Sequence, residues 1–178
     1  MRNFFRLHVL TRRRHGLPPQ PYRFFRNIHE ELISKGFGFI VSASQKETNC
    51  PIAASVFLSY GDKAIYKFGA SDESKWNVRP NNLIMWEGIK YLVRSGFKWL
   101  HFGRTDLSNE GLRKFKLSWG AQEKLLNYLQ FSNGNKLWRI VESNADSSRV
   151  SKITGQIFSH LPLLLNRTAG ALIYPHLD

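Results

Sequence analysis

Cysteine is almost absent from this sequence: Cys50 is the only one among 178 residues. A single cysteine excludes an internal disulfide. Because Cys50 stands outside any cluster of cysteine and histidine residues, the sequence also predicts no metal site of the zinc type. Cys50 lies next to Pro51 and is interpreted as a small buried side chain.

Long apolar runs are also missing. No stretch approaches the roughly 18–20 apolar residues that a membrane-spanning helix needs. The N-terminus is basic and aromatic, and it lacks the apolar core of a signal peptide. The sequence therefore predicts a cytoplasmic protein, and it leaves open a peripheral contact with the inner face of the cell membrane.

The sequence is rich in positive charge and in aromatic residues. The formal net charge is +13 and the isoelectric point is about 10.2. Such a charge favours an anionic partner, which is a nucleic acid, a phosphate-bearing substrate or an acidic membrane surface, although solubility accounts for part of it. With 42% hydrophobic residues, 13 Phe and 5 Trp, the chain is expected to form one domain with an aromatic-rich core.

The order of predicted elements indicates an α/β (α+β) fold with a mixed sheet. Hairpin-linked strands are followed by crossover helices, which add parallel strands. We expect a single domain with a helical N-terminal segment (1–36), a mixed-sheet core (37–131) and a C-terminal helical segment (132–178). Periodicity and turn residues predict helices near Phe4–Val9, Tyr22–Lys35, Asn82–Ser95, from Ser108 or Asn109 to Trp119, and Val150–Leu161, and strands at Phe37–Ser44, Ile52–Tyr60, Ala64–Gly69, Lys98–Gly103 and Leu125–Phe131.

The helix at Asn82–Ser95 is expected to begin with a capping asparagine. Met85, Trp86, Ile89, Leu92 and Val93 form one apolar stripe at helical spacing, and further apolar residues lie on the opposite side. Both faces of this helix are therefore expected to meet protein.

Lys116 stands out because it lies on the apolar side of its predicted helix. Leu112, Phe115 and Trp119 form the apolar stripe. Lys116 lies four residues after Leu112 and three before Trp119, which places it on the same side of the helix. A lysine in this position either extends its ammonium outward to water or meets an anion inside a cleft.

His101 and Arg104 flank the end of the predicted strand Lys98–Gly103. Arg104 has the geometry to bind a phosphate or carboxylate with two parallel hydrogen bonds. His101 is a candidate base, although a hydrogen-bonded structural role is the stronger interpretation for it alone. Strand alternation places the two residues on opposite faces, so they need not share a site.

The polar loop from Ser71 to Asn82 joins a predicted strand to a helix, which is a common place for substrate contacts. Ser71, Asp72, Arg79 and Asn81 are the candidate substrate-binding residues there. The alternative is that Asn81 or Asn82 only caps the helix. The loop lacks the Gly-x-Gly pattern that cradles phosphate.

The cationic segment Arg12-Arg13-Arg14-His15 precedes Gly16 and two prolines and is predicted to form a turn. Two interpretations have equal weight. The arginines form a solvated run of charge, or they bind phosphate on a tRNA, a lipid precursor or a membrane.

The order of these motifs resembles the FemAB-like branch of the GNAT acyltransferase superfamily. Each motif alone is weak, but their order and spacing together are fairly specific and cover nearly the whole chain. The resemblance rests on Thr11–Gly16, Gly69-Ala70-Ser71, Pro80-Asn81, Trp86, Phe102-Gly103-Arg104, Phe115-Lys116, Trp119-Gly120-Ala121, Leu161-Pro162-Leu163, Asn166 and Gly170.

The resemblance implies a GNAT fold and transfer of an acyl group to an amine. FemAB-like proteins usually hold two GNAT units in tandem, and this chain looks like the second unit alone, so a separate first half is an expected partner. The resemblance implies a role in peptidoglycan or polysaccharide synthesis. It implies an aminoacyl-tRNA or acyl-CoA donor and an anionic or lipid-linked acceptor. The missing Gly-rich loop disfavours acetyl-CoA held in the usual GNAT manner.

The resemblance also changes the interpretation of Lys116. The Phe115-Lys116 pair matches residues that border the acyl-transfer site in bridge-forming members, which implies that Lys116 stabilises an oxyanion. Two competing functions stay open. One is an inert GNAT half that binds RNA or protein, and the other is a CoA-dependent acetyltransferase of small amines.

Overall fold

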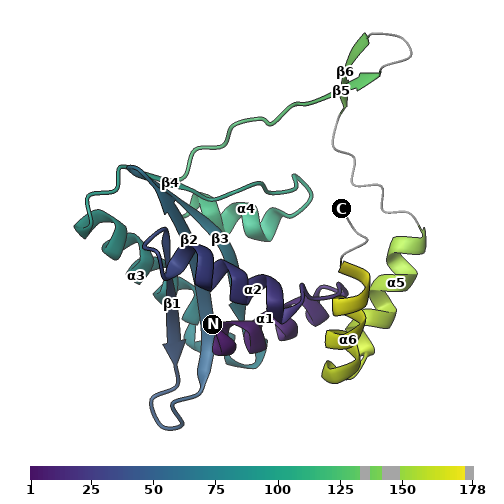
Figure 1. Cartoon of the computed structure of the whole chain (residues 1–178), viewed down its shortest axis with the longest axis horizontal. Coiled ribbons are helices and arrows are strands. Elements are labelled where there is room, and N and C mark those ends of the chain that lie inside the picture. Colours follow the sequence, from purple (N-terminus) through teal and green to yellow (C-terminus); the bar gives the residue numbers. More distant parts are fainter. Residues whose placement is uncertain (133–136, 142–148, 175–178) are drawn as a thin grey trace. The chain divides into compact units, whose positions relative to one another are not determined.

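The computed structural model describes residues 1–132, 137–141 and 149–174 of the chain. Figure 1 labels the helices and strands of these residues, which divide into two compact units. The first unit comprises Met1–Gly103 together with Ile153–Asp178, and the second comprises Arg104–Lys152. Each unit is described by itself.

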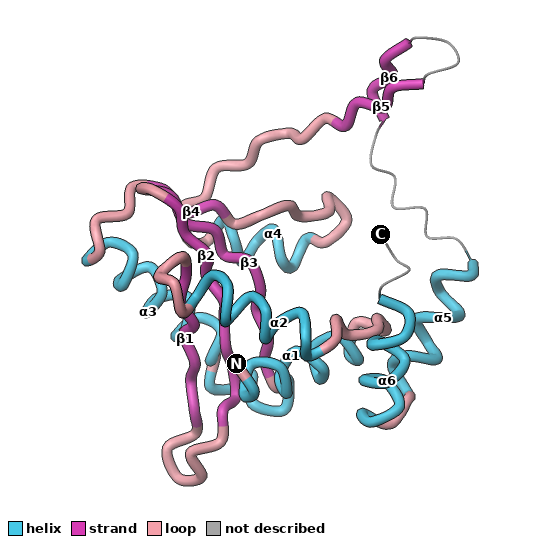
Figure 2. The backbone as a smooth tube through the Cα atoms, in the orientation of Figure 1, coloured by secondary structure: helices cyan, strands magenta, loops and turns pink. Residues whose placement is uncertain are grey.

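A four-stranded mixed sheet forms the centre of the first unit (Figure 2). The strands β1 (Gly38–Ser44), β2 (Pro51–Tyr60), β3 (Lys63–Ser71) and β4 (Trp99–His101) lie side by side in this order. The first three are antiparallel, and β4 runs parallel to β3. The almost entirely apolar β2 is a central strand and is buried over most of its length. The predicted mixed sheet is therefore confirmed.

Helices cover both faces of this sheet. The helices α1 (Arg2–Arg14) and α2 (Tyr22–Ile28) pack against one face, where phenylalanines of both helices meet Ala54 and Val56 of β2. The helix α2 continues as a single π-helical turn, η1 (His29–Ile33). The helix α3 (Pro80–Arg94) packs on the opposite face, where Ile84 meets Ala53 of β2. Alternation along β2 sends neighbouring side chains to these two separate cores.

The helix α3 approaches the sheet closely at a glycine. A Cβ atom on Gly88 would lie 2.5 Å from the ring of Phe57, so only glycine allows this spacing. The face that packs on the sheet is made by Ile84, Met85, Gly88 and Leu92.

The prediction for the stripe of α3 is partly wrong. Met85 and Leu92 are buried as expected, but Trp86 is 51% and Val93 is 68% exposed. Because α3 carries apolar residues all round, its sequence allows more than one packing face, and the close approach at Gly88 selects one of them.

From Ile153 onward the first unit also contains most of one helix and the whole of another. The helix α5 (Arg149–His160) agrees with the predicted helix, whereas α6 (Leu163–Ile173) was not predicted. Pro162 directly precedes α6. A Cβ atom on Gly170 would lie 2.2 Å from the carbonyl oxygen of Pro19, so α6 packs directly against the loop between α1 and α2.

The second unit contains α4 (Glu110–Leu117) and a separate antiparallel pair, β5 (Tyr128–Ser132) and β6 (Leu137–Val141). Asn109 caps α4 as predicted, since its side chain accepts a hydrogen bond from the Leu112 amide. The last predicted strand begins later than expected and pairs with the unpredicted β6. The sequence Ser-Asn-Gly-Asn at 132–135 predicts a turn. Ser132 is instead the last residue of β5, and residues 133–135 lie outside the described part of the chain.

The interpretation of Cys50 as a buried residue is wrong. Its side chain is exposed in the loop that joins β1 to β2. The carbonyl of Cys50 accepts a hydrogen bond from the Gln45 amide at 2.9 Å, which helps to close this hairpin. The main chain of Cys50 therefore has the structural role, and its thiol faces solvent.

Within the described part of the chain, no helix has the length and apolar character needed to cross a membrane. No group of three or more potential metal-ligating side chains is found among these residues either.

Candidate functional site

The hydroxyl of Ser71 organises the loop that follows β3. Ser71 is buried, and its Oγ accepts one hydrogen bond from Trp76 Nε1 at 3.0 Å and another from Asn81 Nδ2 at 3.2 Å. A serine hydroxyl has two acceptor positions and one donor hydrogen. Both acceptor positions are occupied, so Ser71 positions its neighbours and is poorly suited to act as a nucleophile.

Thr11 of α1 holds the main chain of Ser71 in place. Its Oγ1 accepts a hydrogen bond from the Ser71 amide at 3.0 Å and donates one to the Ser71 carbonyl at 3.3 Å. These bonds join α1 to the end of β3 across 60 positions of sequence. The candidate loop is therefore attached to the rigid α1–sheet core.

The loop itself is built from a short helix. Asp72 accepts hydrogen bonds from the amide and hydroxyl of Ser74 and so begins the 3-10 helix η2 (Glu73–Val78). Arg79 then adopts a left-handed conformation with φ of +50°, and Pro80 is the first residue of α3. Proline is well suited to this first position because no intrahelical partner is lost.

The expected capping role of Asn81 or Asn82 is wrong. Arg79 occupies the N-cap position of α3, so both asparagines lie inside the first turn. The side chain of Asn81 is turned to Ser71 instead. The predicted capping pattern failed because Pro80 allows the helix to begin two residues earlier.

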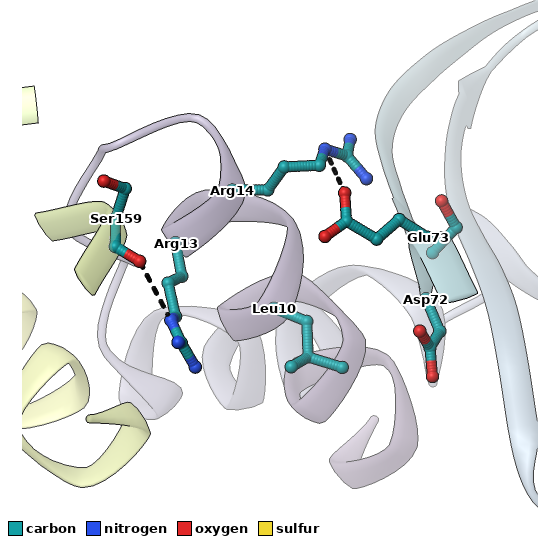
Figure 3. A pocket seen from close by; sticks show the side chains of 7 residues that line it. Leu10, Arg13, Arg14, Asp72, Glu73 and Ser159 are labelled. Atoms are coloured by element: carbon teal, nitrogen blue, oxygen red, sulfur yellow. Dashed lines mark hydrogen bonds and ion pairs between the residues drawn. The ribbon is translucent and has the colours of Figure 1, made fainter. Parts of the chain in front are cut away.

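A pocket of about 230 Å³ lies beside this loop (Figure 3). It is lined by Leu10, Arg13 and Arg14 of α1, by Ser71 at the end of β3 with Asp72 and Glu73 after it, and by Ser159 of α5. The cationic and anionic side chains face one another across it. Arg14 Nε lies 3.9 Å from a carboxylate oxygen of Glu73. The Arg14 guanidinium also lies 4.5 Å from the centre of the Trp76 ring.

The three predicted anion-binding arginines form the last turn of α1, and the expected turn begins only after them. Basic side chains are favourable there because they face the negative end of the helix dipole. Arg12 Nε donates to the Pro18 carbonyl at 3.0 Å, and Arg13 Nε donates to the Ser159 carbonyl at 3.2 Å. Burial lowers the pKa of Arg12 and of Arg14. Their role in binding phosphate stays a prediction.

His101 at the end of β4 makes the structural hydrogen bond that its position suggested. Its Nδ1 accepts from the Gly103 amide at 2.9 Å, and the ring is exposed. Gly103 has a φ of +71°, which favours glycine at this turn.

Lys116 lies in the second unit and is buried, with 8% of its surface exposed. Its Nζ donates to Thr105 Oγ1 at 2.6 Å and to the Arg104 carbonyl at 3.3 Å. Burial lowers its pKa, since water solvates the charged form better than the protein interior does. Its ammonium is therefore held on the inner side of α4 by two neutral acceptors.

The predicted site residues fall into two groups. Ser71 and Asn81 are joined directly, the pocket beside them is lined by Arg13 and Arg14, and the exposed Arg79 belongs to the same loop. Lys116, Phe115 and Arg104 belong to the second unit, where the Phe115 and Trp119 rings meet edge to face.

Sequence reasoning missed the roles of Trp76 and Thr11 beside Ser71. The sequence analysis included Thr11 only as part of a motif. No local sequence pattern indicates a role for Thr11 or Trp76, because each contacts Ser71 only in the folded chain.

Comparison with known proteins agrees with this fold. Residues 1–120 match the acetyltransferase (GNAT) domain family. The structure is similar to FemX, with a TM-score of 0.58 and 18% sequence identity over 67% of this chain and 47% of FemX. This chain thus spans about half the length of FemX.

It is also similar to a tetramutant of the BH1408 protein from Bacillus halodurans, with a TM-score of 0.55 and 16% identity over 71% of this chain and 90% of that one. No curated protein sequence matches significantly. The predicted GNAT-like fold is confirmed, and the similarity to FemX agrees with the FemAB-like resemblance at the level of the fold. The assignment as a second unit alone stays a prediction. The matched region covers more than half of the sequence, and the chain therefore belongs to the acetyltransferase (GNAT) domain family.

Proposed function

We propose that this chain transfers an acyl group to an amine in cell-envelope synthesis and forms an amide bond. The observation that carries the proposal is the buried ammonium of Lys116 in a chain of the GNAT family. The similarity to FemX supports the choice of acyl transfer at the level of fold. The envelope role, with a peptidoglycan or polysaccharide precursor as acceptor, rests on the FemAB-like sequence motifs.

The proposed reaction passes through a tetrahedral intermediate. The neutral acceptor amine attacks the carbonyl carbon of the donor, a C–N bond forms, and the carbonyl electron pair moves to oxygen. Collapse of this oxyanion re-forms the carbonyl and breaks the C–O bond of an aminoacyl-tRNA ester or the C–S bond of a thioester. The amine proton passes to water or to the leaving group.

Lys116 supplies positive charge for this oxyanion. A charge inside a poorly hydrated site acts more strongly than one in water, and it needs no rearrangement if it is already held in place. The hydrogen bonds to Thr105 and to the Arg104 carbonyl hold the Lys116 ammonium in place.

The loop after β3 is proposed to bind the anionic part of a substrate. Arg13 and Arg14 line the pocket beside Ser71, and the exposed Arg79 lies further along the same loop. The loop is built as a 3-10 helix and contains no glycine between Ser71 and Asn82. GNAT proteins usually bind CoA through a glycine-rich loop, so the absence of glycine here supports a donor that is bound in another way.

The test is a transfer assay with two donors, aminoacyl-tRNA and acetyl-CoA, and an amine-bearing lipid-linked peptidoglycan precursor. Mass spectrometry detects the product, and resistance to hydroxylamine separates an amide from an ester. Lys116→Met removes the charge and keeps much of the apolar volume. Lys114→Met is the matched control, because Lys114 lies on the same helix with its side chain 79% exposed.

We expect Lys116→Met to lower kcat by a factor of about 100 to 1,000, the effect of losing one oxyanion-stabilising group. Lys114→Met should retain normal turnover. Circular dichroism of both variants establishes that the fold is kept. Equal turnover of wild type and Lys116→Met would remove Lys116 from the mechanism, and no product from either donor would contradict the proposed function.

A second candidate function is a GNAT half that binds RNA or a partner protein without catalysis. The net charge of +13 and the coverage of only 47% of FemX favour it. Titration with charged and uncharged tRNA at two salt concentrations separates the two functions. Tight binding without turnover in any donor assay favours the binding module, and weak binding to both tRNA forms that is lost with salt indicates nonspecific charge attraction.

A further inference from the structure

Three turns at one end of the central sheet each present an exposed aromatic side chain and a lysine. Lys35 and Phe37 lie between η1 and β1. Tyr60 and Lys63 flank the β2–β3 turn, Lys98 lies between α3 and β4, and Trp99 is the first residue of β4. We name this set of six residues the aromatic end of the sheet.

The aromatic end is one continuous surface. The Phe37 carbonyl accepts a hydrogen bond from Ser59 of β2, and the rings of Phe37 and Tyr60 lie 6.4 Å apart. In the sheet register Tyr60 pairs with Lys63, and Lys63 pairs with Trp99. Residues paired across strands point to the same face, so Tyr60, Lys63 and Trp99 form a row on one face.

The third turn is fastened to the second by hydrogen bonds. The carbonyl of Asp62 accepts from the Lys98 amide at 2.9 Å and from the Trp99 amide at 3.3 Å. The aromatic side chains are therefore presented by a hydrogen-bonded scaffold. Little chain ordering is required when such a surface binds a partner.

The exposure of these aromatic side chains is high. Tyr60 is 82%, Trp99 is 66% and Phe37 is 44% exposed, while the aromatic residues of the core beside α1 are buried. Contiguous exposed apolar surface rimmed by polar groups marks an interaction site.

The charge around this surface is mainly positive. Lys63 and Lys98 lie within it, and the neighbouring Arg94 ends α3. Asp62 is the acidic residue of the β2–β3 turn, and Lys35 forms an ion pair with Glu31. The surface thus combines tryptophan, tyrosine and phenylalanine with lysines.

We propose that the aromatic end of the sheet is a docking surface for an anionic lipid bilayer. Tryptophan and tyrosine rings partition to the level of the lipid headgroups, because one part of the ring is apolar and the other polar. Lysines beside them are attracted to anionic headgroups. The aromatic residues sit on turn tips and strand ends, which suits shallow insertion into a flat interface.

This surface lies away from the pocket described above. The pocket is at the Ser71 end of β3, and the aromatic end is at the Lys63 end of the same strand. The opposite end of the sheet is the one that carries the β1–β2 hairpin, which projects downward in Figure 1. The proposal stands independently of acyl transfer, since membrane binding requires no donor or acceptor.

The test is co-sedimentation of the 178-residue chain with vesicles of phosphatidylcholine alone and of phosphatidylcholine mixed with phosphatidylglycerol. Tyr60→Ser combined with Trp99→Ser removes two aromatic rings. Lys63→Glu combined with Lys98→Glu reverses two charges and leaves the aromatic rings in place. Trp86→Ser is the matched control, because Trp86 is 51% exposed and lies beside Lys90 on another surface, within α3.

We expect the wild type to bind the mixed vesicles. The charge-reversal variant should lose at least tenfold in affinity, since each lysine near an anionic surface contributes about fivefold. The aromatic variant should lose a similar factor, whereas Trp86→Ser should bind normally. Vesicles that carry a lipid quencher should quench the fluorescence of the wild type and of Trp86→Ser, and should quench the aromatic variant less.

Several results would overturn the proposal. No wild-type binding to anionic vesicles would do so, as would an equal loss in Trp86→Ser. Protection of the aromatic end by self-association, detected by sedimentation velocity, would assign it to a second copy of this chain. Binding of a single-stranded RNA oligonucleotide through these residues, without vesicle binding, would assign it to nucleic acid instead.

Discussion

The hydroxyl of Thr105 accepts a hydrogen bond from the ammonium of Lys116 at 2.6 Å. This bond favours the charged form of the lysine, whereas burial favours the neutral form, and burial dominates because the pKa is lowered. We predict that Lys116 loses its proton at lower pH than an ordinary lysine does. A 13C NMR titration of the Lys116 side chain measures this shift. In Thr105→Val the midpoint of Lys116 should fall further, and an unchanged midpoint would contradict the assigned role of Thr105.

The pH dependence of acyl transfer follows from the same pKa shift. Stabilisation of an oxyanion requires the charged lysine, so turnover that depends on it should decline as pH rises through the lowered pKa. In Lys116→Arg the decline should move to higher pH, since arginine stays charged. The measurement is kcat against pH for both proteins, and coincident profiles would show that another group causes the decline.

Removal of the Ser71 hydroxyl should destabilise the loop after β3. Ser71→Ala leaves Trp76 Nε1 and Asn81 Nδ2 without their shared acceptor, which is expected to cost about 1–3 kcal/mol. Denaturant unfolding measures the change, and Trp76 fluorescence should shift with it. Ser74→Ala is the control, because Ser74 is exposed, loses only its hydroxyl bond to Asp72 and keeps the amide bond, so stability should change little. Equal stability of the two variants would mean that the Ser71 bonds contribute no net stabilisation.

Gly88 should resist substitution. A Cβ atom there would lie 2.5 Å from the Phe57 ring, so Gly88→Ala is expected to destabilise the protein by about 1–3 kcal/mol. Gly111→Ala is the matched control, because it lies within α4 with nothing near its Cβ position. Alanine should stabilise that helix by up to about 1 kcal/mol. Thermal unfolding separates the two, and Phe57→Leu should partly rescue Gly88→Ala.

Acid should destabilise the first unit through His8. Its ring is buried against Phe4 and Phe25, and its pKa is lowered from 6.5 to about 4, mainly by burial. The unfolded chain therefore takes up the proton first on acidification. The contribution of His8 to the free energy of unfolding is complete above pH 6.5, and it falls by roughly 3 kcal/mol as the pH is lowered toward 4. Unfolding free energies of wild type and His8→Gln across this range measure the effect, and parallel curves would contradict it.

The exposed thiol of Cys50 should react in the folded protein. Because Cys50 is the only cysteine, a thiol-specific chromogenic reagent should report one equivalent per chain. The rate in native protein should be close to the rate in denaturant, and a much slower native reaction would show that the thiol is buried.

Local sequence patterns predicted much of the sheet unit. The long apolar run of β2 predicts a buried central strand, and the phenylalanine spacing of α1 predicts a helix with one buried face. Both features are present in the structure. The apolar stripe of α4 placed Lys116 on the inner side of the helix, but it left open whether the ammonium extends to water, and only the structure shows the side chain buried. By contrast, β6 and α6 were missed. Their apolar segments are short, so the spacing of apolar residues does not distinguish a helix from a strand.

The sequence by itself determined the strand pattern, the positive charge, the lack of a disulfide and the motif order that indicates the GNAT family. Tertiary structure alone decided that Asn81 turns to Ser71, that Trp86 faces solvent and that the aromatic residues of three separate turns gather at one end of the sheet. The physical reason is that periodicity and capping act within a few residues. Hydrogen bonds such as that between Thr11 and Ser71 join positions 60 apart and form only when the whole unit packs.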